Sequence, residues 1–396
     1  MDISSSSYLM KKIYKLSVPY LTENEKKNVS RVLDSGWITS GPITNKLENL
    51  IIKKIKAKNV ISVNSATSGI FISLIALGAK KGDEVITPSN TYISTINTLY
   101  NLGLKIKLCD VCSKTGNVDE ETFKKAITKK TKFFIPVHNG GNPVNLEKII
   151  KISKKNKIKL IDDAATAFGA KIKKKFVGSY NFTTTVFSLH ANKIITSGEG
   201  GFVCTNNKPL AKKIRLLANS GLSKDSWNRK KIKNYRILNT ILPGYKLNLN
   251  DILSSIAIEQ IKKINKIINQ RYELKKRYMK KLYNLIIDNK IYIPFIKKNY
   301  KSALYNFQII LKSKDFSRDK LSSFLQKKNI YTGIHYTPAH VHDFYRNKLK
   351  KEKLNNTNYI FKNCLSLPFH NKMSLGDVDF ICKQINIFFR NEDKKK

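Results

Sequence analysis

The chain has 396 residues, of which 41% are hydrophobic and 10% aromatic, so it can bury a large core and form two or three domains. The 74 Lys and Arg residues outnumber the 28 Asp and Glu residues and give a net charge of +46. No apolar run reaches membrane-spanning length, and the N-terminus lacks the apolar stretch of a secretion signal. We therefore expect a cytoplasmic protein without a membrane partner.

A charge this positive is typical of proteins that bind nucleic acid or an anionic surface. Lysine is nevertheless spread along nearly the whole chain together with abundant Ile and Asn, which indicates a compositional bias. No zinc-finger, RNP or basic-zipper pattern occurs, so we expect no nucleic-acid partner. The five cysteines are scattered, and the CxxC-like pair Cys109 and Cys112 has no second pair or nearby histidine. We expect no metal site and a reducing compartment.

The N-terminal part of the chain predicts a helix and a loop. Pro19–Leu33 reads as an amphipathic helix that follows a Thr22 cap and carries acidic residues in its first turn. The segment Gly36–Pro42 (GWITSGP) is either a plain turn between helices or a rim loop that touches a ligand.

Strands and helices then alternate as far as residue 217. The predicted strands are Val60–Val63, Glu84–Thr87, Ile106–Asp110, Phe133–Val137, Ile158–Ile161 and Thr184–Ser188. The predicted helices are Ile70–Leu77, one that starts around Pro88–Tyr92, Glu120–Ile127, Leu146–Ser153 and Lys208–Leu217. Repeated units of this length predict an α/β fold with a mostly parallel sheet and helices on both faces. Ligands of such sheets bind at the carboxyl ends of the strands.

The last part of the chain has a different texture. Asn250–Ile287 predicts one long helix or two. Beyond it we expect strands at Phe307–Leu311 and Ile330–His335, and helices at Arg318–Lys327 and Leu375–Phe389. We therefore predict a large domain over residues 1–250, followed over residues 251–396 by a linking helix and a small α+β domain.

Polar residues gather where the predicted strands end. The residues at or just beyond such ends are Thr67, Tyr92, His138, Asp163, Ser188 and Lys193. The turn Asn64–Gly69 also lies between a strand and a helix, where free backbone N–H groups and the helix dipole attract an anion. Because these ends meet at one edge of the sheet, we expect one site there.

Lys193 lies in FSLHANKIITSGEGGFVCT, between two apolar strands. Burial would lower the pKa of its amine and leave a neutral nucleophile that condenses with aldehydes. Such an amine would suit a Schiff base with pyridoxal 5'-phosphate (PLP). The alternative is that Lys193 is one of the many exposed lysines of this chain.

Asp163 could supply the anion that keeps the ring nitrogen of PLP protonated. Alternatively, Asp162 and Asp163 cap a following helix at Ala164–Phe168. Ser188 could donate to the cofactor phosphate, or be an ordinary serine at a strand end.

Two further residues have both a functional and a structural interpretation. Tyr92 could stack on the cofactor ring, or be a core aromatic residue. His335, in TGIHY, could meet the substrate, or be a packing residue with satisfied hydrogen bonds.

Several motifs follow one another in a fixed order along the chain. They are SATSG, SNTYISTIN, IPVH, IDDAATAFG, FSLHANKIITSGEGG, PGYKLNLND and TGIHYTPAH. This order resembles that of the DegT/StrS-type nucleotide-sugar aminotransferases, from about Ile13 to Phe389. The resemblance implies a PLP-dependent transferase of fold type I, with a mostly parallel seven-stranded sheet flanked by helices and a smaller C-terminal α+β domain.

The resemblance also implies roles for residues of the cofactor site. Lys193 matches the Schiff-base lysine and catalytic base, and Asp163 the acid at the pyridine nitrogen. Ala66, Thr67 and Ser188 match the phosphate cradle, and Tyr92 the stacking aromatic. Thr166 stands near the cofactor where the family usually has His or Gln. PGYKLNLND resembles a segment that reaches into a neighbouring subunit, so Lys246 or Asn248 would complete the phosphate site of an obligatory homodimer.

Within the family, the chain looks most like the branch that makes UDP-4-amino-4-deoxy-L-arabinose. The likeness lies in GWITSGP with Thr39, DSWNRK with Trp227 and Arg229, and TGIHYTPAH with His335. These residues would then face the sugar nucleotide. Asp162 stands where Glu is usual, and Asn139-Gly140-Gly141 where Tyr-Ala-Gly is common.

The implied reaction moves an amino group from L-glutamate to a keto group of a nucleotide-linked sugar, such as a UDP-4-keto-pentose, for cell-surface polysaccharide or lipopolysaccharide. Two alternatives stay open. Some relatives are PLP-dependent sugar dehydratases with a histidine in place of the lysine, which Lys193 disfavours. A regulatory protein on an aminotransferase scaffold is disfavoured by the retention of Asp163 and Lys193.

Overall fold

The computed structural model describes residues 12–222, 239–312, 316–350 and 352–394 of the chain. Its centre is a seven-stranded sheet in the order β1-β9-β8-β5-β4-β2-β3. These strands are β1 (Asn59–Val63), β9 (Gly201–Thr205), β8 (Thr183–Ser188), β5 (Lys159–Asp163), β4 (Thr131–Phe134), β2 (Glu84–Pro88) and β3 (Lys105–Cys109). The pairs from β8 to β3 are parallel, and β9 runs antiparallel to both of its neighbours. The predicted mostly parallel sheet is confirmed.

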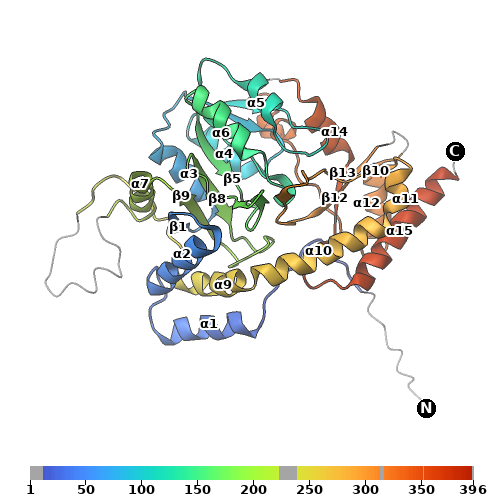
Figure 1. Cartoon of the computed structure of the whole chain (residues 1–396), viewed down its shortest axis with the longest axis horizontal. Coiled ribbons are helices and arrows are strands. Elements are labelled where there is room, and N and C mark those ends of the chain that lie inside the picture. The colour runs from blue at the N-terminus through green and yellow to red at the C-terminus, as the bar shows by residue number, and fades with distance from the viewer. Residues whose placement is uncertain (1–11, 223–238, 313–315, 351, 395–396) are drawn as a thin grey trace, which may run out of the picture.

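Helices cover both faces of this sheet (Figure 1). One face carries α3 (Ala66–Ala76), α4 (Ile93–Asn101) and α7 (Lys208–Ala218). The other face carries α2 (Pro42–Ile55), α5 (Glu120–Ala126), α6 (Leu146–Lys155) and α9 (Asp251–Lys262). Successive strand residues point to opposite faces, so Val186 packs with the first helix layer and Phe187 with the second. Burial on both faces explains why β8 and β9 are buried along their whole length.

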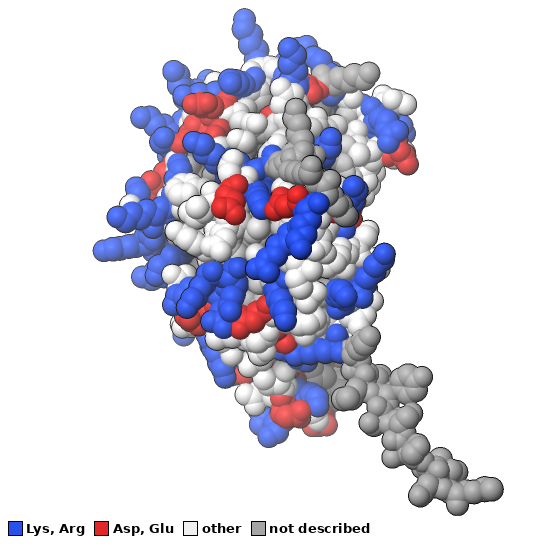
Figure 2. Space-filling view, turned by 90° about the vertical axis from the view of Figure 1, so that its right-hand side faces the viewer, with Lys and Arg blue, Asp and Glu red and all other residues white. Residues whose placement is uncertain are grey.

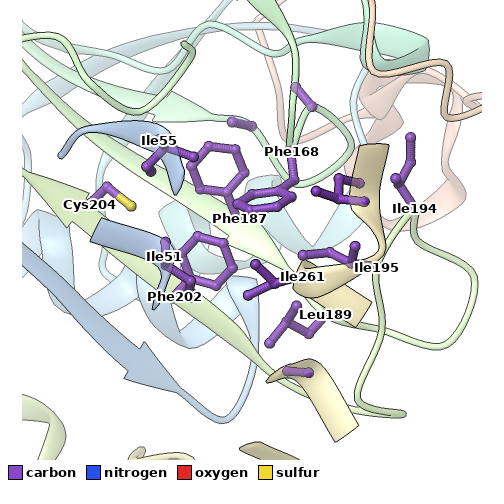
Figure 3. Packing of buried hydrophobic residues seen from close by; sticks show 14 of the residues in the cluster. Ile51, Ile55, Phe168, Phe187, Leu189, Ile194, Ile195, Phe202, Cys204 and Ile261 are labelled. Atoms are coloured by element: carbon purple, nitrogen blue, oxygen red, sulfur yellow. The ribbon is translucent and has the colours of Figure 1, made fainter. Parts of the chain in front are cut away.

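The core next to Lys193 is built around three aromatic rings. Phe187 and Phe202 stack at 5.0 Å between ring centroids, and Phe168 meets both edge-on at 5.6 Å. Figure 3 shows these rings among aliphatic side chains of α2 and α9. Ile194 and Ile195, directly after Lys193, belong to the same cluster. The chain on the C-terminal side of Lys193 is therefore anchored in the core.

A buried carboxylate ties α9 to the loop before α2. Asp251, the first residue of α9, is fully buried and accepts hydrogen bonds from the N–H groups of Gly41, Ile43 and Thr44 at 2.8, 3.1 and 2.9 Å. It therefore caps the N-terminus of α2, where free N–H groups and the helix dipole favour an anion. Helix α1 (Glu23–Asp34) packs outside α9. In this way the segment after PGYKLNLN fixes the GWITSGP loop.

A second, three-stranded antiparallel sheet lies in the C-terminal part of the chain. It consists of β10 (Ile291–Tyr292), β12 (Phe307–Leu311) and β13 (Cys364–Leu367). Helices α10 (Ile264–Lys281), α12 (Arg318–Gln326) and α15 (Leu375–Asp393) pack on it around their own hydrophobic cluster. Figure 1 shows α10 leading from α9 to this part of the molecule. The remaining elements are α11 (Tyr283–Ile287), α13 (Asp343–Arg346), α14 (Asn355–Asn363) and a small sheet of β6 (Lys171–Ile172), β7 (Lys175–Phe176) and β11 (Tyr300–Lys301).

Two local expectations are wrong. Residues 164–168 form turns and not a helix, because the Asp162 and Asp163 carboxylates bond within the site described below. Residues 330–335 form no strand. Ile330 bridges only to Tyr14, and Gly333 only to Ser366, so two separate neighbours hold the segment.

The surface charge is scattered. Figure 2 shows Lys and Arg spread over one face of the molecule, with Asp and Glu between them. In the part of the chain that the structure describes, no helix has the length and apolar character needed to cross a membrane.

Candidate active site

A cavity of about 530 Å³ opens at the carboxyl edge of the large sheet. Eight of the residues predicted for the site line it: Ala66, Thr67, Tyr92, Asp163, Thr166, Ser188, Lys193 and His335. Asp163 and Ser188 end β5 and β8, His335 lies in the segment after α12, and the others follow β1, β2, β5 and β8. The volume lies within the range of small-molecule sites. Five of the six residues expected to meet at the strand ends therefore line one cavity, and His138 does not.

Lys193 lies five residues beyond β8, in a loop closed by backbone hydrogen bonds. Its N–H donates to the His190 carbonyl at 2.9 Å, and Leu189 N–H donates to the Gly200 carbonyl at 2.8 Å. Burial lowers the pKa of the Lys193 amine to about 8, against the opposing influence of the Asp163 carboxylate. The amine is therefore much easier to deprotonate than an exposed lysine.

Asp163 ends β5 and is buried. Its carboxylate accepts hydrogen bonds from the Thr95 hydroxyl at 3.0 Å and from the Ala165 N–H at 3.1 Å. Burial raises the pKa of Asp163, while these two donors and the Lys193 amine favour the anion. Asp163 thus bonds to a turn and to α4 and does not cap a helix.

Asp162 and His138 form a buried pair behind the part of the cavity wall that Asp163 forms. His138 Nε2 lies 2.8 Å from Asp162 Oδ1, and both side chains are fully buried. His138 Nδ1 accepts the Val144 N–H at 3.0 Å, so the ring proton is on Nε2 and is donated to Asp162. The Thr185 hydroxyl donates to the other Asp162 oxygen at 3.3 Å. The pair joins the segment after β4 to β5 and so supports Asp163.

The N-terminus of α3 has free N–H groups of the kind that bind anions. The Ser65 side chain caps α3 by accepting the Ser68 N–H at 3.1 Å, and the N–H groups of Ala66 and Thr67 belong to the first turn, which has no intrahelical acceptors. Ser188 Oγ accepts the His190 N–H at 3.2 Å and keeps its own proton to donate. A side chain on Gly201 would place its Cβ 2.7 Å from Ala66 N, so only glycine lets β9 approach this turn.

Tyr92 and Thr166 line the cavity in different ways. The Tyr92 side chain is 60% exposed and is the N-cap of α4, so the core interpretation of this residue is wrong. The Thr166 hydroxyl donates to the His138 carbonyl at 2.7 Å. Thr166 therefore has only acceptor lone pairs left for a ligand.

Three rings from the C-terminal part of the chain, those of Tyr305, His335 and Tyr336, also line the cavity. His335 Nδ1 lies 2.8 Å from Ser366 Oγ, and burial, assisted by the Lys193 charge, lowers the pKa of His335 to about 4. The Tyr305 ring lies 4.8 Å from Lys193 Nζ and meets the His335 ring edge-on at 5.7 Å. Tyr336 is the third ring, and its N–H donates to Asn90 Oδ1 at 3.0 Å. The sequence interpretation missed Tyr305, Tyr336 and Thr95.

Two predicted residues, Thr39 and Asn248, lie outside the cavity lining. Thr39 is exposed, and its carbonyl accepts the Asp251 N–H at 3.2 Å. Asn248 pairs with Val63 at the end of β1, and its buried Oδ1 has no hydrogen-bond partner among the described residues. Neither lines the cavity of its own chain. Trp227 and Arg229 lie outside the described residues.

This chain matches the model of the DegT/DnrJ/EryC1/StrS aminotransferase family over residues 19–386. The chain belongs to this family. It is accordingly a PLP-dependent sugar aminotransferase with the fold type I architecture.

Relatives agree with this assignment. Protein MJ1066 of Methanocaldococcus jannaschii, itself uncharacterized, is 39% identical over 364 residues, which are 91% of this chain and 93% of that protein. The solved structure of Helicobacter pylori PseC, an aminotransferase involved in the biosynthesis of pseudoaminic acid, has a TM-score of 0.87 and 27% identity, with 96% of this chain and 100% of PseC covered. The PLP form of the sugar aminotransferase Spr1654 from Streptococcus pneumoniae has a TM-score of 0.86 and 25% identity, with 97% and 99% covered.

The side chains of the cavity fit PLP. The cofactor has an aldehyde, a ring nitrogen and a phosphate, and the cavity offers a buried amine, a buried carboxylate and a helix N-terminus with a serine hydroxyl. The buried hydroxyl of Thr91, on the same cavity, has no hydrogen-bond partner among the described residues. A polar ligand would satisfy it.

Proposed function

We propose that this enzyme transfers the amino group of L-glutamate to the keto group of a nucleotide-linked sugar, such as a UDP-4-keto-pentose. The observation that carries the proposal is that Asp163, Lys193 and the N-terminus of α3 all face one cavity. The names of PseC and Spr1654 support a sugar substrate. We further propose that the enzyme is cytoplasmic and serves the synthesis of a cell-surface polysaccharide or lipopolysaccharide.

Several groups besides Lys193 would hold the cofactor. Asp163 would accept a hydrogen bond from the protonated ring nitrogen, and the Thr95 and Ala165 donors keep its carboxylate in place. The N–H groups of Ala66 and Thr67 and the Ser188 hydroxyl would bind the phosphate. Tyr92 would cover the ring, and Thr166 would accept from it.

Lys193 would hold the cofactor and then move the proton. Bound PLP supplies an electron-accepting ring that stabilises charge on the carbon that carries the amino group. With a pKa of about 8, the Lys193 amine can take a proton at Nζ and return it near neutral pH. The neutral His335 ring, which faces the same cavity, is placed to hydrogen bond to a substrate without adding charge.

We also propose that the active enzyme is a homodimer in which each chain completes the partner's site. Asn248 does not line the cavity of its own chain, and Thr39 is exposed on a loop that Asp251 fixes. Asn248 would reach the partner's phosphate site, and Thr39, Trp227 and Arg229 the partner's substrate. We keep the division into residues 1–250 and 251–396 as part of this proposal, because one hydrophobic cluster has all of its buried residues between Leu274 and Phe389, although α9 packs with the large sheet.

Glutamate titration of the purified holoenzyme tests the reaction. The absorption band of bound PLP should convert to that of pyridoxamine phosphate in the wild type and should not do so in Lys193→Ala. A panel of nucleotide-linked keto sugars should then restore the first band. If glutamate leaves the wild-type band unchanged, the proposed donor is wrong. If no keto sugar restores it, the proposed acceptor is wrong.

Subunit mixing tests the composite site. Lys193→Ala and Asn248→Ala chains are each assayed alone at limiting cofactor and then unfolded, mixed and refolded together. A shared site regains about a quarter of wild-type activity, since half of the dimers are mixed and each has one intact site. No gain on mixing would show that each chain provides its own Lys193 and Asn248.

A further inference from the structure

Among the described residues, one aromatic ring is the main group that positions the Lys193 amine. Lysine has a flexible four-carbon stem, so a reactive amine needs something to position it. Among the described residues, Lys193 Nζ makes no hydrogen bond or ion pair, and its close contact is the Tyr305 ring, 4.8 Å away. A cation at this distance from a ring is attracted by the quadrupole of the ring. The position of Tyr305 therefore decides where the charged amine lies.

Tyr305 is held from two sides. Its N–H donates to the Gly140 carbonyl at 3.2 Å, and Ala303 N–H donates to the Gly141 carbonyl at 2.9 Å. On the other side, Arg271 Nη1 donates to the carbonyls of Tyr305 and Leu304 at 2.9 and 3.1 Å. This segment is thus clamped between the large domain and α10.

Arg271 is an unusual anchor because its side chain is buried and its charged guanidinium donates hydrogen bonds to carbonyl oxygens. It also donates to the Phe369 carbonyl at 3.1 Å and to Asn371 Oδ1 at 2.8 Å. Burial lowers the pKa of Arg271 to about 10, so the guanidinium stays charged at neutral pH. A buried cation satisfied in this way holds its acceptors firmly.

On the side opposite Arg271, Gly140 and Gly141 allow their turn to approach the segment that carries Tyr305 closely. Gly140 and Gly141 have φ values of +64° and +82°, a region that other residues rarely adopt. A Cβ on Gly140 would lie 2.7 Å from Asn306 Oδ1, and one on Gly141 would lie 3.0 Å from Tyr305 N. The Asn139-Gly140-Gly141 turn, which departs from the common family pattern, is therefore matched to the segment that carries Tyr305.

We propose that Tyr305 is a positioning residue for the amino-transfer reaction, and that the Gly140-Gly141 turn and Arg271 seat its ring over the Lys193 amine. The proposal rests on the proposed role of Lys193 as the cofactor lysine. The ring favours the charged amine and keeps it at the cavity, whereas burial favours the neutral amine. Burial raises the pKa of Tyr305 itself to about 12, so the phenol stays neutral and adds no charge.

The test measures how the reactivity of the Lys193 amine depends on pH in the absence of substrate. The full-length protein is freed of cofactor, and the pH dependence of reductive methylation at Lys193 is followed by peptide mass spectrometry. Asp163 and His335, the ionisable groups that act on Lys193 besides Tyr305, are unchanged in all variants. Tyr305→Leu should lower the pH of half-maximal labelling by roughly 0.5–1 pH unit, and Tyr305→Phe should leave it at the wild-type value because the ring remains.

The clamp is tested with Gly140→Ala, which should shift the labelling curve in the same direction as Tyr305→Leu. Circular dichroism confirms that each variant is folded, and Tyr305→Met replaces Tyr305→Leu if the latter does not fold. If the variant without the ring, Tyr305→Leu or Tyr305→Met, is labelled with the same pH dependence as the wild type, the proposal is overturned. Because neither glutamate nor a sugar nucleotide is present, failure of the proposed substrate leaves this result unaffected.

Discussion

The Thr95 hydroxyl donates a 3.0 Å hydrogen bond to Oδ2 of Asp163, and so α4 holds the carboxylate that ends β5. Without Thr95, Asp163 Oδ2 would be buried without this donor and the pKa of Asp163 would rise further. Thr95→Val should therefore raise the Kd for PLP by roughly tenfold, as measured by absorbance titration.

The matched control for this experiment is Thr98→Val. Thr98 is buried on the same helix, but its hydroxyl donates to the Ser94 carbonyl. An equal loss of affinity in both variants would mean that α4 packing matters and the Asp163 hydrogen bond does not.

Removing one partner of the buried His138–Asp162 pair should strongly lower the stability of the protein. His138→Ala leaves the Asp162 carboxylate buried with the Thr185 hydroxyl, and should lower the free energy of unfolding by about 3–5 kcal/mol. Urea unfolding of both single variants and of the double variant with Asp162→Leu measures the coupling. The double variant should lose less than the sum of the singles, and strict additivity would contradict the pair.

Lys193 should cost stability in the cofactor-free protein. Its pKa falls from the ordinary 10.5 to about 8 on folding, so below pH 8 the folded state must bury a charge. This cost disappears as the pH rises from about 8 to 10.5. Lys193→Met should raise the free energy of unfolding by about 2–3 kcal/mol at pH 7 and by less at pH 9.5.

Lys130, which is exposed, provides the control. Lys130→Met should change the free energy of unfolding by no more than about 0.5 kcal/mol at either pH. Equal effects of the two substitutions would contradict the burial of the Lys193 amine.

His335 should make the protein sensitive to acid. Its pKa falls from 6.5 to about 4 on folding, so its full contribution is present above pH 6.5 and is lost as the pH falls toward 4. Between pH 7 and 5 the wild type should lose about 1–2 kcal/mol more than His335→Gln, which cannot titrate. Urea unfolding at both pH values measures this, and equal losses would show that His335 is accessible to protons.

The periodic parts of the fold were predictable and the irregular parts were not. Phe307–Leu311 is a run of apolar residues in the small sheet, and the structure places β12 over the same residues. The helix α2 was missed, although Pro42 at its start and apolar Leu47, Ile51 and Ile55 at helical spacing mark it. The apolar residues of 330–335 suggested a strand because the pattern cannot show that two separate neighbours share them.

The site was predictable where residues follow a strand and not where tertiary contacts decide. Asp163 ends one buried strand and Lys193 follows another, and their positions at the sheet edge could be inferred from the order of elements. Tyr305 reaches the cavity because Gly140 and Arg271 bind its backbone, and no local pattern reports contacts over such sequence separations. The sequence suggested that Asp162 caps a helix, whereas in the structure its carboxylate pairs with His138, which no local pattern predicts.

The most direct measurement is to locate the cofactor in the chain. The holoenzyme is reduced with sodium borohydride, digested and analysed by mass spectrometry, with Lys193→Ala treated in parallel. The account predicts that the added mass of the reduced cofactor is found at Lys193 and is lost in the variant. Attachment at another lysine, or no attachment to the wild type, would contradict the central claim that Lys193 is the lysine that holds PLP.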